Sequence, residues 1–211
     1  MRLKNNLLIF VTLVFLISTY LRNTVWHTEV SLWSDVVKKS PEKARPHFNL
    51  GLALLNADRY IEAEKEFRAT LGIAPYYHKA KYYLAESLFR TGRYKEALQY
   101  LKEVELLYEK VLPEFPEKWE GVSKAFTASD LYNNIASCYY YLGDLLSAER
   151  YYRKALAIDR YHLFSIKGLT TVLVDAGKTK EAINFIRDTL REMPYDKEKD
   201  ELYRILKELE G

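Results

Sequence analysis

The sequence has 211 residues, of which 48% are hydrophobic and 29% are charged, a balance typical of a globular chain and not of a disordered one. Its 32 basic and 29 acidic residues leave a net charge of +3 without a basic stripe, which argues against a nucleic-acid partner. A single cysteine, Cys138, excludes an intramolecular disulfide and a multi-cysteine metal site.

The amino terminus carries an uncharged apolar run, Leu7–Leu21, which follows a basic start and ends at Arg22. At helical rise this run covers about 22 Å, against about 30 Å for the hydrocarbon core of a bilayer. Since long basic side chains reach the interface from both ends, we expect residues 1–22 to form a single-pass membrane anchor. A cleaved signal peptide is the alternative. The charges of Arg2 and Lys4 place the rest of the chain on the extracytoplasmic, periplasmic side.

A short sequence motif recurs in the chain after the amino-terminal segment. Ala57–Phe67 and Thr91–Leu101 share an Arg-Tyr pair, a Glu-Ala pair and a large apolar residue four positions after the alanine, at an offset of 34 residues. Two further copies, around Ala148 and Ala182, are again 34 residues apart, and 17 residues are inserted before them. A fixed period of this length indicates a solenoid of stacked helix pairs.

Each copy predicts a helix, a turn and a second, antiparallel helix. Three sets of residues fix this pattern. The turn residues, expected to take positive φ, are Asp58, Gly92, Gly143 and Gly177. The small residues, expected where the two helices cross closely, are Ala63, Ala97, Ala148 and Ala182. The large residues, expected one turn later on the same face, are Phe67, Leu101, Tyr152 and Ile186.

At these residues the sequence resembles the tetratricopeptide repeat (TPR) family. The resemblance implies an all-α fold, a right-handed superhelix of about four helix pairs at residues 44–77, 78–111, 129–162 and 163–196. The pattern also predicts a half unit at 23–43, whose helix spans Thr24–Lys39, an insertion at 112–128 and a polar capping helix at 197–211. The sequence departs from the family at His47 and Lys81, which replace large apolar residues, and at Glu109 and Arg160, which replace a closing proline.

In this family the first helices of the pairs line a concave groove, and contact residues occupy fixed places in each unit. Here those places carry aromatic, amide and charged side chains, which suit the capture of an extended or helical segment of another protein. The predicted groove residues are Arg45, Phe48, Asn49, Leu52, Lys79, Tyr82, Tyr83, Glu86, Phe89, Arg90, Asn133, Asn134, Ser137, Tyr140, Tyr141 and Lys167, and the same places include Asp130, Phe164 and Gly168. Asn49 and Asn134 stand where the family holds a peptide backbone with an amide. The alternative for the tyrosines is that they fill spaces between helices.

The sequence contains no phosphate-binding loop, nucleophile elbow or zinc-protease motif, so we expect no enzyme activity, catalytic residue, cofactor, metal or small-molecule substrate. Cys138 lies on the side of its helix that faces the partner helix and is predicted to be a buried, inert thiol. His78 and His162 fall at unit boundaries and are predicted to be polar surface residues.

A second resemblance covers residues 22–51, which are similar to the junction between the last membrane helix and the TPR tail of mannosyltransferase-like membrane proteins. The multispanning catalytic part of those proteins has no counterpart in this sequence, so the resemblance implies topology and not glycosyl transfer. We therefore expect a membrane-anchored interaction scaffold; the alternative is an accessory or detached tail of a membrane glycosyltransferase system. The insertion, with Trp119, is expected either to cover the array or to form a lip of the groove.

Overall fold

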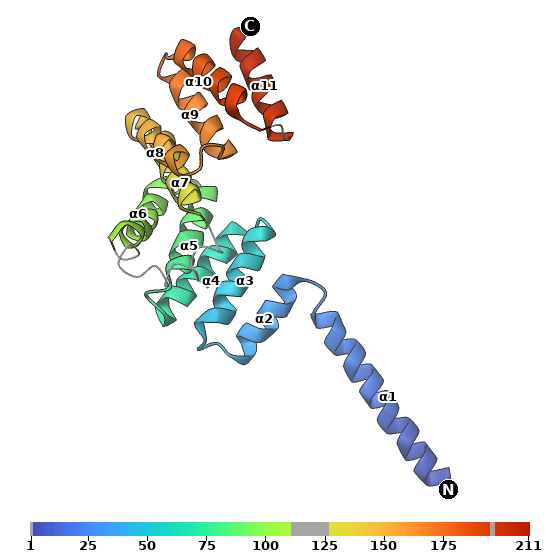
Figure 1. Cartoon of the computed structure of the whole chain (residues 1–211). Helices are drawn as coiled ribbons and strands as arrows, with labels where there is room; N and C mark the ends of the chain where they lie inside the picture. The colour runs from blue at the N-terminus through green and yellow to red at the C-terminus, as the bar shows by residue number, and fades with distance from the viewer. Residues whose placement is uncertain (1, 111–126, 195–196) are drawn as a thin grey trace. The chain divides into compact units, whose positions relative to one another are not determined.

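The computed structural model describes residues 2–110, 127–194 and 197–211, and the regular structure in them is helical throughout. This confirms the predicted all-α class for the described residues. The helices, labelled in Figure 1, are α1 (Arg2–Val25), α2 (Glu29–Lys39), α3 (Ala44–Asn56), α4 (Tyr60–Ile73), α5 (His78–Arg90), α6 (Tyr94–Lys110), α7 (Ala128–Tyr141), α8 (Leu145–Ile158), α9 (Leu163–Asp175), α10 (Thr179–Glu192) and α11 (Lys197–Glu210). The chain forms two compact units, Met1–Ala80 and Lys81–Gly211, and each is described by itself.

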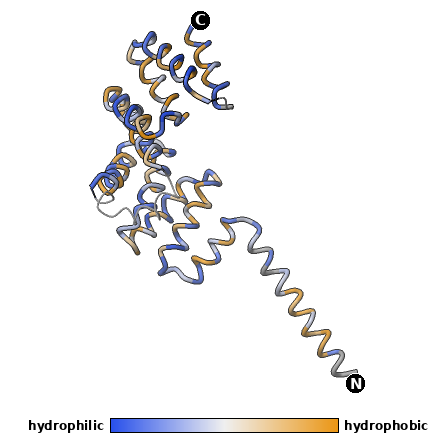
Figure 2. Tube along the Cα trace, in the orientation of Figure 1, coloured by the Kyte–Doolittle hydropathy of each residue, from blue (hydrophilic) through white to orange (hydrophobic). Residues whose placement is uncertain are grey.

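Helix α1 contains the apolar run of the amino terminus. Figure 2 shows hydrophobic residues along the middle of this helix, and large apolar side chains from Leu7 to Tyr20 are exposed. Within the described residues, no helix has both the length and the apolarity that a membrane crossing requires. The structure therefore does not support the predicted membrane-spanning helix at residues 1–22, whose uncharged run is shorter than the about 20 apolar residues of a typical span.

Helix α2 begins at Glu29 and not at Thr24, because a cap forms at Thr28. The Thr28 hydroxyl accepts a hydrogen bond from the Ser31 backbone N–H at 3.1 Å, and the Ser31 hydroxyl accepts one from the Thr28 N–H at 3.1 Å. This reciprocal pair satisfies two N–H groups that the start of a helix otherwise leaves unpaired. The predicted single helix over Thr24–Lys39 is therefore wrong: α1 continues to Val25, and α2 is a separate helix that packs against α3.

Helices α3 and α4 pack closely around a glycine. Gly51 of α3 faces the ring of Phe67 from α4, and a Cβ at Gly51 would lie only 2.6 Å from the nearest ring carbon. Phe67 is fully buried, and its ring centroid is 5.9 Å from that of Phe48, which in turn lies 4.9 Å from that of Tyr77. Glycine is therefore required at position 51 of α3, because the ring of Phe67 from α4 fills the space that a Cβ would occupy.

His47 and Lys81, which replace large apolar residues of the repeat pattern, have polar partners in the folded chain. His47 is buried, with Nδ1 2.6 Å from a Glu66 carboxylate oxygen and Nε2 2.9 Å from the Pro41 carbonyl oxygen. Lys81 donates to the carboxylate of Glu103 on α6. Buried polar groups are tolerated when they are hydrogen-bonded, so these two positions keep the packing of the pair without an apolar side chain.

The three sets of residues that define the repeat occupy their predicted places. The turn residues have positive φ: 57° at Asp58, 80° at Gly92, 83° at Gly143 and 75° at Gly177. The four crossing alanines, Ala63, Ala97, Ala148 and Ala182, have no exposed surface. The large residues that follow them, Phe67, Leu101, Tyr152 and Ile186, are also buried. Local conformation and packing therefore follow directly from the repeated pattern.

In the second unit, consecutive helices pack from α6 to α11, and α7 also contacts α9. Helix α6 is longer than the other second helices of the pairs and is described as far as Lys110. Helix α7 begins after Thr127, whose hydroxyl accepts from the Asp130 N–H at 3.1 Å. Trp119 and the rest of the predicted insertion between Lys110 and Thr127 lie outside the described residues.

The last helix packs against the preceding pair, and α9, α10 and α11 lie side by side in Figure 1. Leu202 of α11 is fully buried in a cluster with Ile166 of α9 and Ile186 of α10. The side chains of Ile205, Leu206 and Leu209 pack against the same cluster, so the predicted apolar stripe of the last helix covers the end of the core.

A carboxylate is buried between α6 and α8. The side chain of Glu105 accepts hydrogen bonds from Lys102, from Lys154 at 3.2 Å and from the Tyr151 hydroxyl at 3.3 Å. The Lys154 ammonium also lies 4.1 Å from the centre of the Tyr132 ring. Two cations and a hydroxyl therefore replace the water that Glu105 loses on folding.

Candidate functional site

The predicted groove residues of the first unit lie on α3 and at the start of α5. Phe48 is buried between Phe67 and Tyr77 and is a core residue of the α3–α4 pair. The others are exposed or half-buried: Arg45, Asn49, Leu52 and Lys79.

In the second unit, seven predicted groove residues lie together around a cavity of about 340 Å³. Helices α5, α6, α7 and α9 supply its lining: Tyr82, Ala85, Glu86, Phe89, Arg90, Leu101, Asp130, Asn133, Asn134, Ser137 and Phe164. Sequence reasoning missed Ala85 and Leu101 because both have the pattern of core residues. Their repeat positions, which face the neighbouring helix, were the available signal.

Four predicted groove residues of this unit do not line the cavity. The Tyr83 ring packs edge-on against Tyr82 at 5.3 Å between centroids. The Tyr140 hydroxyl donates to Asp175 at 2.8 Å, and Tyr141 is exposed and stacks on Tyr94 at 4.7 Å between centroids. The fourth, Lys167, donates to Glu201 of α11 at 2.6 Å. These side chains are used in contacts within the chain or lie on the surface away from the cavity lining.

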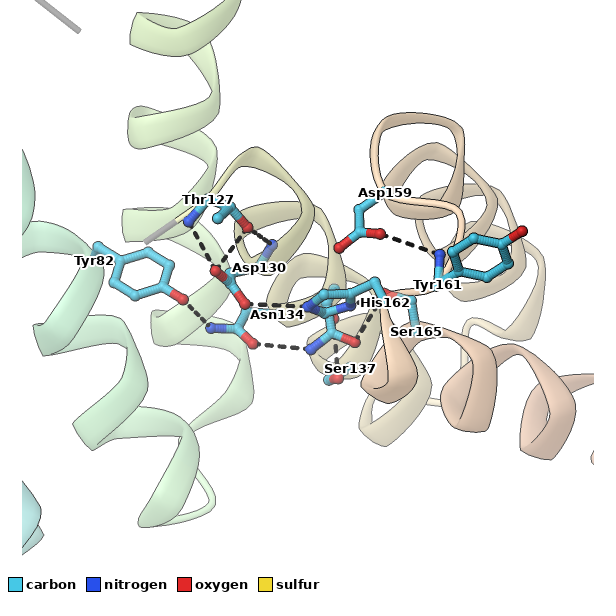
Figure 3. Close-up of polar contacts among 10 residues, drawn as sticks. Tyr82, Thr127, Asp130, Asn134, Ser137, Asp159, Tyr161, His162 and Ser165 are labelled. Atoms are coloured by element: carbon cyan, nitrogen blue, oxygen red, sulfur yellow. Dashed lines mark hydrogen bonds and ion pairs between the residues drawn. The ribbon is translucent and has the colours of Figure 1, made fainter. Parts of the chain in front are cut away.

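A hydrogen-bonded chain of side chains forms one wall of the cavity (Figure 3). The amide nitrogen of Asn134 donates to the Tyr82 hydroxyl at 2.9 Å, and its oxygen accepts from the Asn133 amide at 3.2 Å. The Asn133 oxygen accepts in turn from the Ser165 hydroxyl at 3.2 Å. An amide has two N–H groups and two lone pairs, so Asn134 has one donor site and one acceptor site without a partner among the described residues.

Asp130 is held by the start of its own helix and by α9. One carboxylate oxygen accepts from the backbone N–H and the hydroxyl of Thr127, both at 2.7 Å, and the other accepts from His162 Nε2 at 3.1 Å. The hydrogen bond from His162 lowers the pKa of Asp130 to about 2, and the two bonds from Thr127 act in the same direction. His162 is thus a bridging residue between two helices, and its prediction as a plain surface residue is wrong.

The electrostatic environment differs between the two carboxyl groups of the cavity. Burial raises the pKa of Glu86; the charge of Arg90 lowers it, and that of Asp130 raises it further. Burial also raises the pKa of Tyr82 well above its ordinary value, so its hydroxyl stays protonated. The cavity therefore combines a fixed anion at Asp130, a partly desolvated carboxyl at Glu86 and neutral amide and phenol groups.

Ser165, His162 and Asp130 form a hydrogen-bonded series that invites comparison with a hydrolytic triad. His162 Nδ1 lies 2.8 Å from the Ser165 oxygen, and Nε2 contacts Asp130. However, Ser165 has no exposed surface, and a nucleophile has to reach its substrate. In the described part of the chain, no group of three or more His, Cys, Asp and Glu side chains has the arrangement of a metal site. The geometry is that of a helix-bridging contact.

Comparison with known proteins identifies the repeat. One tetratricopeptide repeat model matches residues 54–115, and a second matches residues 129–162. These two segments carry tetratricopeptide repeats. The TPR fold also relates it to solved structures: MamA from Desulfovibrio magneticus RS-1 (TM-score 0.63, 18% identity, 77% of this chain and 82% of that one) and PilF from Pseudomonas aeruginosa (TM-score 0.61, 17% identity, 92% and 81%). Similarity at this level of identity shows the fold alone.

Two further matches have a function in their descriptions. YrrB, described as a TPR protein with an unusual peptide-binding site, has a TM-score of 0.56 and 15% identity over 77% of this chain and 75% of that one. A protein O-mannosyl-transferase of Caenorhabditis elegans is 33% identical over 78 residues, which are 36% of this chain. The match spans 11% of that much longer protein, so the similarity is distant and partial.

Proposed function

We propose that this TPR protein is an interaction scaffold that binds an extended segment of a partner protein in the cavity formed by α5, α6, α7 and α9. The observation that carries the proposal is the cavity itself, because its lining joins residues of successive repeats that the family pattern had marked as contact positions. Under the proposal, the chain forms a right-handed TPR superhelix with repeats at the boundaries predicted above.

The chemistry of the cavity suits a peptide. Asn134 has a spare donor and a spare acceptor, which is the combination that a peptide backbone requires. The rings of Phe89 and Phe164 offer apolar contact area at low cost in conformational entropy. Binding of this kind relies on backbone hydrogen bonds for affinity and on side-chain contacts for specificity.

Selection from a random peptide library displayed on phage tests this proposal. We expect the immobilised protein to enrich specific peptides, and Phe89→Ala or Asn134→Ala to abolish their binding. The matched control is Leu146→Ala, which removes an 80% exposed side chain from α8 outside the cavity lining. A lack of enrichment, or binding that survives both cavity substitutions, would refute the proposed site.

A second candidate function rests on the partial similarity to an O-mannosyl-transferase. In this alternative the chain is an accessory or detached tail of a membrane glycosyltransferase system. A photo-crosslinking residue in place of Phe89 separates the two candidates in cells. Recovery of a polytopic sugar transferase favours the alternative, whereas recovery of a different class of protein removes it.

We further propose that the amino-terminal segment keeps the array at a membrane, with the repeats on the extracytoplasmic side. The support is the row of exposed large apolar side chains on α1, including Leu8, Phe10 and Phe15, which water solvates poorly. Fractionation of cells before and after carbonate washing tests attachment. Protease added to intact spheroplasts tests the side: a protected array contradicts the outward orientation.

A further inference from the structure

Glu86 differs from Asp130, the other carboxylate of the cavity lining. Its side chain on α5 is half-buried and lines the cavity, yet it has neither a hydrogen bond nor an ion pair to any residue in the described part of the chain. Asp130 on α7, in contrast, accepts three hydrogen bonds from Thr127 and His162. A carboxylate that loses water without gaining a donor destabilises the fold, so Glu86 is a residue whose role is not explained by stability.

The charge around Glu86 favours a cation. Asp130 is ionised because its pKa lies at about 2, and its negative charge adds to that of Glu86 in the same cavity lining. Among the described residues of the lining, Arg90 is the single basic side chain, so the lining holds two carboxylates and one guanidinium. A positive group that enters the cavity therefore meets a net negative environment, and a negative group meets repulsion.

The apolar part of the lining suits the stem of a basic side chain. Phe89 and Phe164 line the cavity together with Leu101 and Ala85. Lysine and arginine carry three or four methylene groups that pack on apolar surface, and aromatic faces attract their cationic ends. At about 340 Å³ the cavity is at the small end of the range for ligand pockets, which suits one or two side chains of a peptide and not a folded domain.

We propose that the partner segment inserts a lysine or arginine side chain into this cavity, where its cation pairs with Glu86 and its stem packs against Phe89 and Phe164. This inference rests on the proposed function and names the chemistry of the partner. Insertion of an acidic side chain or of the carboxyl terminus of a peptide is disfavoured, because the negative charges of Glu86 and Asp130 repel a carboxylate.

The phage library provides the first test, with wild type, Glu86→Gln and the control Glu181→Gln, an exposed carboxylate on α10 that pairs with Arg153. We expect wild type and the control to enrich peptides with a lysine or arginine at a fixed position, and Glu86→Gln to lose that preference. Peptides that bind through the cavity without a basic residue, or with acidic ends, overturn the inference and leave the proposed function standing. An absence of enriched peptides overturns both.

A double-mutant cycle then measures the interaction energy between Glu86 and the basic residue of the peptide. The best wild-type peptide, labelled with fluorescein, is compared with the same peptide in which its basic residue is methionine, by fluorescence anisotropy. Glu86→Gln and the peptide change should each weaken binding about 10- to 100-fold, and together little more than either alone, because both remove the same charged contact. Fully additive losses would show that the cation does not meet Glu86. The unfolding midpoint of each variant confirms that the protein remains folded.

Discussion

The packing of Gly51 against Phe67 yields a quantitative prediction. An alanine Cβ at position 51 would lie 2.6, 2.8 and 2.9 Å from three carbons of the Phe67 ring, whereas carbon atoms in contact are normally about 3.5 to 4.0 Å apart. The ring is fully buried, so it cannot swing into solvent. Overpacking of this kind costs about 1 to 3 kcal/mol, and the better helix propensity of alanine returns about 1 kcal/mol. We expect Gly51→Ala to lower the free energy of unfolding by about 1 kcal/mol.

The control and the rescue both come from the chain itself. Gly72 lies near the end of α4 with open space around its Cα, so Gly72→Ala should raise stability by about 0.5 kcal/mol. The next repeat has Ala85 and Leu101 at the positions of Gly51 and Phe67, both buried, which indicates that a smaller partner accepts the extra methyl group. In a Phe67→Leu background, Gly51→Ala should therefore become stabilising, a coupling of about 2 kcal/mol.

Urea unfolding followed by circular dichroism, on the four proteins of the cycle and the Gly72→Ala control, measures these differences. Gly51→Ala should lower the midpoint and Gly72→Ala should raise it slightly. If Gly51→Ala is as harmless as Gly72→Ala, or if Phe67→Leu fails to reverse its effect, the close approach of the two helices does not set the choice of glycine.

Three further predictions concern ionisable groups of the second unit. Glu105→Ala leaves two lysines without their shared carboxylate and should cost about 3 kcal/mol in urea unfolding, against less than about 1 kcal/mol for the exposed Glu103→Ala; equal losses would contradict the role of burial. Cys138 is buried, which raises its pKa to about 12, so a thiol reagent at pH 8 should label it only after unfolding, and fast labelling of the native protein would refute this. Because the pKa of Asp130 is lowered in the folded state, its contribution to stability is present above about pH 4 and is lost as the pH falls towards 2. The stability difference between wild type and His162→Ala should therefore shrink over that range, and a constant difference would argue against the His162 contact as the cause.

Comparison of equivalent positions shows how far the sequence predicts the candidate site. Phe48, Tyr82, Asn133 and Lys167 occupy the same place in successive units and were predicted as equivalent contacts. In the structure Phe48 is part of a core, Tyr82 is buried with its hydroxyl on Asn134, and Lys167 reaches Glu201 on α11. The pattern identifies the helix face that carries these residues. It does not specify which neighbouring side chains cover that face, because they come from a different repeat.

The contact between Asp130 of α7 and His162 at the start of α9 could not be predicted from the sequence for the same reason. Asp130 and His162 are 32 residues apart, and nothing in the local sequence of either residue signals a partner. The start of α2 was misplaced at shorter range, because the reciprocal cap at Thr28 makes the helix begin at Glu29 and not at the predicted Thr24.

The sequence by itself determined the helix pairs, their turns and their close crossings, since backbone conformation and the size of a side chain at a helix contact are local properties that recur with the repeat. Tertiary structure alone decided which polar groups meet in the cavity, how Asp130 is held, and that Glu86 lines the same cavity as two aromatic rings without a donor in the described chain. Those outcomes depend on side chains from three helices that approach one another only after the repeats have stacked.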